Sequence, residues 1–209
     1  MRKIDKGTPL ESFLKFVRTH PHARWEDAKD MSYVWRKHML NCEQHGMSGY
    51  TEEPLKQENS HIDHFRKKSL FNTLVFDWNN FIVDGVDETY GAKFKDKYVT
   101  RREDNDRLLI NPVTEDVGRF FKYELNGNIS VASGLSPSDA ARADYTIRAF
   151  NLNEASLSER RKRIINIVMD CFRDLTDESI LKALESEGFK SVVEQLLDER
   201  KKRRIPDDD

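Results

Sequence analysis

The change of hydrophobic period along the chain is the feature that most limits its fold. Near the start, apolar residues recur at helical spacing, at Leu10, Phe13, Leu14 and Val17, and a helical period returns after Leu157. Between about residues 61 and 151, short apolar runs alternate with turn signals, which is typical of strands and loops. The pattern predicts an α+β fold in which helical ends flank a mixed centre.

The expected elements follow from these periods. We expect helices near residues 9–19, 26–40, 157–175, 180–184 and 192–197, and strands at 61–65, 74–83, 107–113, 119–125 and 129–133. Asn-Gly-Asn at 126–128 predicts a hairpin turn, because asparagine and glycine tolerate positive φ. The chain divides into segments 1–58, 59–151 and 152–209, which we expect to pack as one compact unit.

Composition sets limits on function. The two cysteines, Cys42 and Cys171, are too far apart and too few for a disulfide framework or a four-cysteine zinc site, so a reducing compartment fits best. No apolar run approaches the roughly 20 residues that span a bilayer. We therefore expect a soluble, cytoplasmic protein with no membrane partner. The net charge of -2 means that any nucleic-acid binding must use a local patch.

Two histidines flank an aspartate in the stretch NSHIDHFRKK, at His61, Asp63 and His64. Side chains alternate along a strand, so His61 and Asp63 are expected on one face and His64 on the other. Aspartate is a hard ligand that suits magnesium or manganese, and a neutral imidazole can take a proton from water. The trio suggests metal-assisted hydrolysis of a phosphodiester; the simpler interpretation is two histidines on a polar surface.

Neighbouring residues favour the hydrolytic interpretation. Arg66, Lys67 and Lys68 adjoin the histidines and could contact flanking phosphates. In FDWNNFIVDG, either Asn79 or Asn80 could hold the turn between two strands, and YGAKFKDKY at 90–98 predicts a short helix with a cationic face. Two strands followed by a helix, with Asp-His on the first strand and Asn entering the second, is the layout of a His-Asn-His nuclease.

Longer blocks carry a more specific resemblance. HIDHFRKK, FDWNNFIV, GAKFKD, LLINPVTEDVGRFFKYELNGNI and TIRAFNLNEASLSERR resemble successive blocks of the PtuB family, and the similarity runs from about residue 9 to 165. Members of that family are His-Asn-His (HNH) endonucleases of bacterial anti-phage defence (Septu systems) and partners of PtuA ATPases. Retron-associated members work beside a reverse transcriptase and its DNA product, and this chain resembles those.

The resemblance implies a ββα-metal nuclease core between helical ends, with a role for each motif residue. His64 would be the general base, Asp63 a ligand of Mg²⁺ or Mn²⁺, and Asn80 the residue that orders the loop. His61 would be a second ligand or a phosphate contact. Lys93 and Lys95 on the helix join the expected nucleic-acid contacts.

Two departures from the family pattern change what we expect. Cys42 and His45 have the spacing of only half a zinc knuckle, so a structural zinc ion is not expected. The third metal-site residue is also missing, and Tyr90, Lys93 and Asp96 remain alternatives for it.

The expected function is a metal-dependent endonuclease that acts as the effector of a defence complex under the control of a PtuA-like ATPase. Its substrate would be DNA or an RNA such as tRNA. The sequence itself has no phosphate-binding loop of the Gly-x-x-x-x-Gly-Lys-Ser/Thr type. The alternative, favoured by the missing third residue, is a catalytically degenerate subunit that docks on the ATPase or binds nucleic acid.

Overall fold

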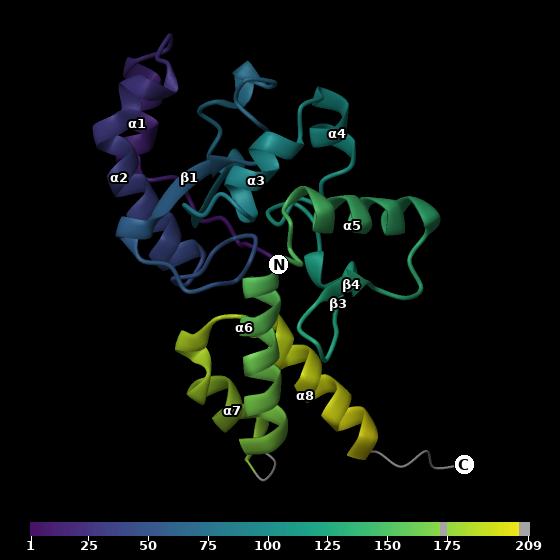
Figure 1. Cartoon of the computed structure of the whole chain (residues 1–209). Helices are drawn as coiled ribbons and strands as arrows, with labels where there is room; N and C mark the ends of the chain where they lie inside the picture. The colour runs from purple at the N-terminus through teal and green to yellow at the C-terminus, as the bar shows by residue number, and fades with distance from the viewer. Residues whose placement is uncertain (172–174, 205–209) are drawn as a thin grey trace.

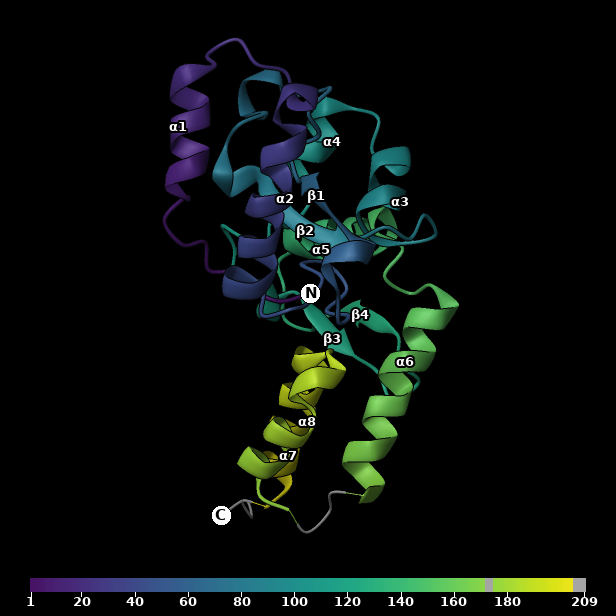
Figure 2. The same cartoon turned by 90° about the vertical axis from the view of Figure 1, so that its left-hand side faces the viewer.

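The computed structural model describes residues 1–171 and 175–204, and the fold is α+β. Helices α1 and α2 stand beside a central two-stranded sheet, α3 to α5 lie on its other side, and α6 to α8 form a separate group of helices below it (Figures 1 and 2). No helix within the described ranges is both long enough and apolar enough to cross a membrane.

The N-terminal helices pack through aromatic side chains. The elements of this part are α1 (Glu11–Thr19), η1 (Trp25–Ala28), α2 (Lys29–His38), the short π-helix η2 (Met39–Glu43) and η3 (Gln57–Asn59). Phe13 of α1 contacts Trp35 of α2 edge to face, with 5.1 Å between ring centroids, and also packs on Trp78 and Phe81. As expected, Phe13 is buried, but Leu14 is exposed and Phe16 takes the inward position instead.

The polar segment between α2 and β1 has no helix or strand period, yet its residues 43–53 are mostly buried. Gln44 accepts a hydrogen bond from the backbone N–H of Val83 and donates one to its carbonyl, each at 2.8 Å. The side chain thereby pairs with a strand edge as another strand would. This pairing explains why a segment without strand periodicity still belongs to the core.

The central sheet is antiparallel. Strand β1 (Ser60–His64) pairs with β2 (Phe81–Gly85), so that His64 lies opposite Phe81 and Asp63 opposite Ile82. The connecting segment contains the short helices η4 (Asn72–Leu74) and η5 (Trp78–Asn80), where the sequence predicted one long strand. Helix α3 (Gly91–Tyr98) follows β2 and packs on it, as predicted.

The second half of the centre is more helical than expected. Its elements are α4 (Arg102–Arg107), η6 (Val117–Arg119), β3 (Phe121–Tyr123), β4 (Ile129–Val131) and α5 (Pro137–Ala149). The β3–β4 hairpin was predicted. The predicted strand at 107–113 is wrong: Leu109 and Ile110 are buried in an irregular segment after α4, where the N–H of Ile110 donates to Thr146 of α5. A short apolar run is buried here without strand pairing.

The C-terminal helices share the main core with the centre. They are α6 (Ala155–Asn166), η7 (Ile167–Cys171), α7 (Asp177–Ala183), η8 (Glu185–Glu187) and α8 (Lys190–Arg204). The helical pattern predicts that Val192, Val193, Leu196 and Leu197 are buried within this chain or at an interface with a partner. Val192, Val193 and Leu197 are buried within the chain, and Leu196 is half-buried. The helical period predicts an apolar stripe along residues 157–175 that includes Cys171, Phe172 and Leu175, but Leu175 is exposed. The side chains of Cys171 and Phe172 lie outside the described residues.

The close packing of the β3–β4 turn on α6 can be tested by replacing Gly127 in that turn and, as a control, Gly134. Both have positive φ, +87° and +78°, but a Cβ on Gly127 would lie 1.9 Å from the Ser158 carbonyl oxygen, while nothing is within 4 Å at Gly134. We expect Gly134→Ala to lower the free energy of unfolding by about 1–2 kcal/mol, from the positive φ alone, and Gly127→Ala by roughly 3 kcal/mol or more. Urea unfolding measures both. Equal losses would show that the turn does not pack on α6 in this way.

Candidate active site at the end of strand β1

The three motif residues lie at the end of β1, next to α3. Asp63 and His64 are 3% and 6% exposed, and His61, two residues before Asp63, is half-buried. Because β1 is regular through His64, Asp63 and His64 point to opposite faces of the sheet. The structure therefore places the expected ligand and the expected base in two different environments.

Asp63 is held by two donors on the same oxygen. The Tyr50 hydroxyl donates to Oδ2 at 2.5 Å, and the Lys95 ammonium of α3 donates to it at 2.6 Å. Lys95 also donates to the backbone carbonyl of His64 at 3.0 Å and lies 3.2 Å from Oδ1 of Asp96. Both Asp63 and Lys95 are almost entirely enclosed, with side chains 3% and 1% exposed. Strand β1 is thereby fixed to helix α3 by a buried ion pair.

Both members of the pair are charged at neutral pH. Burial by itself would raise the pKa of Asp63, but Lys95 and the hydroxyl of Tyr50 outweigh it and the pKa is lowered. Burial would likewise lower the pKa of Lys95, but Asp63 outweighs it and the pKa is raised. The shifts of the two partners agree in favouring the ionised pair.

His64 is oriented by one hydrogen bond and two rings. Its Nε2 lies 3.0 Å from the carbonyl oxygen of Val75, and a carbonyl can only accept, so Nε2 carries the proton. The ring packs edge to face against Trp25, at 4.6 Å between centroids, and Phe81, at 5.2 Å. Nδ1 has no hydrogen-bond partner among the described residues and is not one of their fully buried unpartnered atoms. Nδ1 is therefore left as the acceptor of the ring, on a residue that is 6% exposed.

The same surroundings keep the imidazole neutral. Burial lowers the pKa of His64, and the nearby cations Lys68 and Lys95 lower it further, while the Val75 carbonyl and the carboxylate of Asp63 act in the opposite direction. A neutral imidazole with a fixed tautomer and Nδ1 as its acceptor is equipped to take a proton from water.

Asn80 joins the two ends of the loop between β1 and β2. Its Oδ1 accepts from the N–H of Arg66 at 2.6 Å, and its Nδ2 donates to the carbonyls of Arg66 and Leu74, each at 3.0 Å. Asn79, the other candidate, is exposed. The loop that Asn80 fastens carries Val75, so this side chain indirectly sets the position of the carbonyl that orients His64.

The expected phosphate contacts differ in availability. Lys68 is partly exposed near His64 and donates a hydrogen bond to Glu26 at 3.1 Å, while Lys93 is half-buried. Arg66 stacks on Phe65 and lies 3.4 Å from Asp106, and the ammonium of Lys67 donates to the Asp96 carbonyl. Lys95 is enclosed, so its ammonium is not available to a phosphate in this structure.

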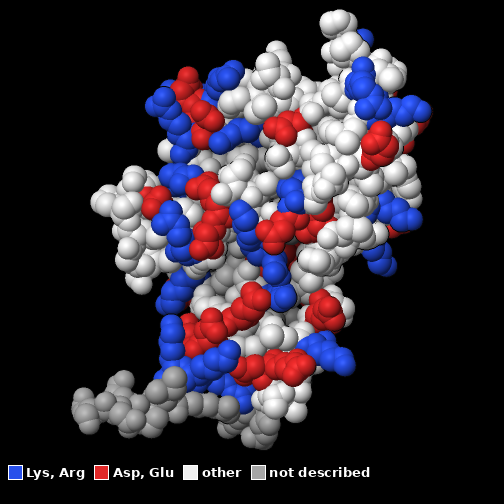
Figure 3. Space-filling model, turned by 180° about the vertical axis from the view of Figure 1, so that it is seen from behind, with Lys and Arg blue, Asp and Glu red and all other residues white. Residues whose placement is uncertain are grey.

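Charges elsewhere on the surface are mixed. The face shown in Figure 3 carries interspersed basic and acidic side chains, without a broad field of one sign. A surface of this kind does not attract a polyanion over long range. Any phosphate contact on that face would therefore depend on individual side chains.

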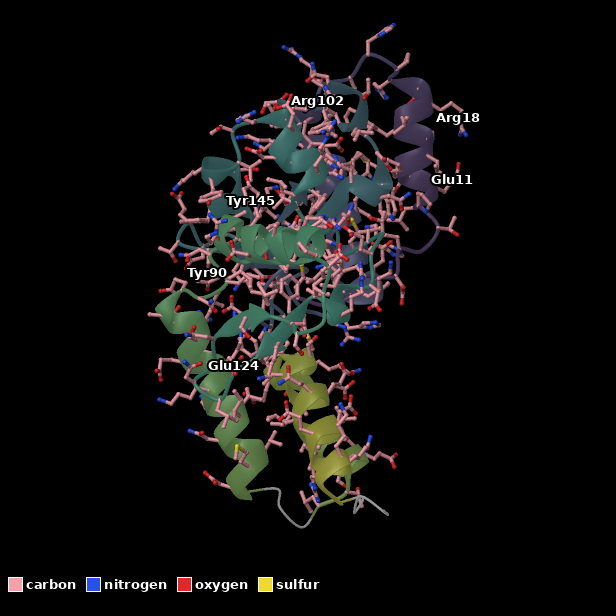
Figure 4. All side chains as sticks on the ribbon, turned by 90° about the vertical axis from the view of Figure 1, so that its right-hand side faces the viewer. Glu11, Arg18, Tyr90, Arg102, Glu124 and Tyr145 are labelled. Atoms are coloured by element: carbon pink, nitrogen blue, oxygen red, sulfur yellow. The ribbon has the colours of Figure 1, made fainter. Side chains whose placement is uncertain are left out.

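The three alternatives for the missing metal-site residue are not equivalent. Only Asp96 reaches the Asp63–Lys95 pair, through Lys95. The hydroxyl of Tyr90 is instead engaged by Glu53 at 3.3 Å and Arg160 at 3.0 Å, and Figure 4 shows Tyr90 beside the start of α6. Lys93, a cation, offers no anionic ligand to a metal ion.

A divalent metal ion does not fit this arrangement. Within the described residues, no three His, Cys, Asp or Glu side chains gather as a possible ligand set. Asp63 Oδ2 already accepts from Tyr50 and Lys95, and the ammonium stands where a second cation would be repelled. His61 Nδ1 is buried without a hydrogen-bond partner, as a metal-binding nitrogen would be, but no set of three such ligands gathers around it among the described residues. The expected Mg²⁺ or Mn²⁺ therefore stays a prediction that this geometry does not support.

Asp84 and Gly91 form a contact that the sequence did not indicate. Asp84 accepts from Ser48 Oγ and, at 2.6 Å, from the N–H of Ala92 at the start of α3. Burial raises its pKa to about 7. Gly91 has φ +70°, and a Cβ there would lie 2.4 Å from Oδ2 of Asp84. Glycine therefore opens the helix that carries Lys95.

Cys42 and His45 lie away from this site. They line a cavity of about 580 Å³ between the N-terminal segment and the C-terminal helices, together with Lys182 and Val193. Asp63, His64 and Lys95 are not among the residues that line it. The cavity therefore offers no room to a substrate of His64.

Neither of two comparisons with known proteins gives a relative: no family model matches the chain, and no curated protein does.

The Asp63–Lys95 pair can be weighed against a surface pair on the same helix. Lys97 pairs with Glu88 at 2.7 Å, but its side chain is 63% exposed. We expect Lys95→Met to lower the free energy of unfolding by about 3–5 kcal/mol, because it leaves a buried carboxylate unpaired, and Lys97→Met by less than about 1 kcal/mol. Urea unfolding at pH 7 measures both. Similar values for the two variants would contradict a buried charged pair.

Proposed function

We propose that this chain is a His-Asn-His endonuclease with a ββα core, built from β1, β2 and α3, that hydrolyses phosphodiester bonds. The observation that carries the proposal is the orientation of His64. Its Nε2 is fixed by the Val75 carbonyl at 3.0 Å, and its Nδ1 is left as the acceptor. An imidazole held in this tautomer presents Nδ1 as its proton acceptor.

The chemistry assigned to the chain's own residues is a single proton transfer and an in-line displacement. Nδ1 of His64 accepts a proton from water as the water oxygen bonds to phosphorus. The bond from phosphorus to the leaving sugar oxygen breaks, and that oxygen is protonated by solvent. Asn80 keeps the loop, and with it His64, in place. No step is assigned to a metal ion, because the site does not fit one as it stands.

The substrate is a nucleic acid whose phosphates meet local cations. Lys68, near His64, and Lys93, near His61, are the side chains best placed to contact a phosphate, since both are partly accessible. Attack by water does not use a 2′-hydroxyl, so DNA and RNA, including tRNA, are both substrates within the proposal.

The resemblance to the PtuB family extends the proposal to its partners. The chain would act in the cytoplasm as the antiviral effector of a retron or Septu defence complex. A PtuA-like ATPase would control it, beside a reverse transcriptase and its DNA product. Its own sequence has no phosphate-binding loop, so ATP would act through that partner.

A second candidate is a docking or nucleic-acid-binding subunit that has lost the chemistry. The Asp63–Lys95 pair favours it, because the carboxylate expected to bind a catalytic ion is already neutralised. His64 distinguishes the candidates, since a docking subunit would not depend on its Nδ1.

The first test replaces His64. We expect His64→Ala to slow cleavage of DNA or total RNA by about 10²–10⁴-fold, the usual contribution of a general base, while His22→Ala, at an exposed position, cleaves as the wild type does. Each variant is purified with any co-encoded ATPase, and circular dichroism confirms that it folds. Equal activity of His64→Ala and wild type would remove His64 from the mechanism.

The second test follows activity with pH. His64 must be neutral to accept a proton, and burial lowers its pKa from about 6.5, so activity should persist below that pH and fall only as pH drops through the lowered value. We expect the acid limb of kcat/KM to lie below pH 6.5 in the wild type. Trp25→Ala exposes the ring and should move the limb to higher pH. A wild-type limb above 6.5 would contradict this environment for His64.

A further inference from the structure

We propose that Lys95 is the cation of this site: its ammonium takes the place beside Asp63 that a divalent ion would take. The protein then binds no divalent ion there, and its hydrolysis of phosphodiesters does not require one. The statement about ion binding stands on the geometry alone. The statement about hydrolysis rests on the proposed function.

Three acceptor oxygens surround the ammonium of Lys95. An ammonium has three donors, and its three neighbours are Asp63 Oδ2 at 2.6 Å, the carbonyl of His64 at 3.0 Å and Asp96 Oδ1 at 3.2 Å. The side chain is 1% exposed, so water does not compete for these contacts. Lys95 is therefore a fixed internal cation.

A divalent ion and this ammonium exclude each other. An ion bound to Asp63 Oδ2 would come close to Lys95 Nζ, which is 2.6 Å from the same oxygen. Repulsion between like charges is strong where water is excluded, and burial here is almost complete.

The position of Lys95 links the cation to the proposed base. By holding the backbone carbonyl of His64, the ammonium fixes the residue whose imidazole faces the other side of β1. Its charge also neutralises Asp63, which would otherwise repel an anionic phosphodiester close to His64. Lys95 is enclosed and does not reach the substrate, so it is a positioning residue.

Manganese binding directly tests whether Lys95 takes the place of a divalent ion beside Asp63, because the measurement does not depend on enzyme activity. The full-length protein is treated with chelator, dialysed and titrated with Mn²⁺, with bound ion followed by electron paramagnetic resonance and thermal unfolding followed in parallel. We expect the wild type and Lys97→Ala to bind no Mn²⁺ at sub-millimolar concentrations and to melt at an unchanged temperature. Lys95→Ala should melt at a lower temperature, bind one Mn²⁺ and recover several degrees when it does.

A double variant, Asp63→Asn/Lys95→Met, removes both charges and should neither bind Mn²⁺ nor change its melting temperature when Mn²⁺ is added. A bound ion in the wild type that the double variant loses would overturn the proposal, and this comparison decides even if Lys95→Ala fails to fold. If Lys95→Ala folds but does not respond to Mn²⁺, Lys95 is an ordinary ion-pair partner and no cation site exists, which also overturns the proposal.

Cleavage assays separate this proposal from the proposed function. Cutting by wild-type protein that a chelator has freed of metal supports both the nuclease activity and the role of Lys95 as the cation. Cutting only after Mg²⁺ or Mn²⁺ is restored overturns the role of Lys95 and leaves the nuclease standing. Absence of cutting under every condition removes the nuclease, while Mn²⁺ binding still decides whether Lys95 is the cation beside Asp63.

Discussion

The buried ion pair between Asp63 and Lys95 is the interaction on which the arrangement of the site depends. It joins the last turn of helix α3 to the end of strand β1, and Lys95 adds a hydrogen bond to the backbone carbonyl of His64. Burying two charges is unfavourable unless each is fully hydrogen-bonded, and here Tyr50 and the carbonyl of His64 complete the pair. The position of the end of β1, and so of His64, follows from this contact.

The orientation of His64 is a second consequence of residues outside the motif. The Val75 carbonyl lies in the loop that Asn80 fastens, and Trp25 comes from a short helix before α2. The histidine is thus held by contributions from the strand, the loop and the N-terminal helices. A substitution in any of these could change activity without touching a substrate.

Much of the fold could be predicted from the sequence, because local residue patterns determine many of its elements. The β3–β4 hairpin follows from Asn-Gly-Asn, and the order β1, β2, α3 from two apolar runs and a glycine-opened helix. Helix α5 was missed although its start is signalled: Ser136 accepts from the N–H of Asp139, and Pro137 occupies the first turn. The run at 107–113 was misread because a buried irregular segment and a buried strand have the same apolar composition.

The candidate site could be predicted from the sequence only in part. Asp63, His64 and Asn80 were selected from a motif, and the structure brings them to one end of β1. The partner of Asp63 could not be found in this way, because Lys95 lies 32 residues further on and appeared to be one of several surface cations. Contacts between distant residues depend on how the elements pack, which no local pattern encodes.

The measurement that tests the central claim most directly is cleavage in water enriched in ¹⁸O. The wild-type protein, freed of metal by chelator, is incubated with labelled DNA and RNA, and the new ends are examined by mass spectrometry. If His64 activates water, each cut places one heavy oxygen on the new terminal phosphate of either substrate. Cyclic phosphate ends, unlabelled phosphates or intact substrates would contradict a metal-independent hydrolase with His64 as its base.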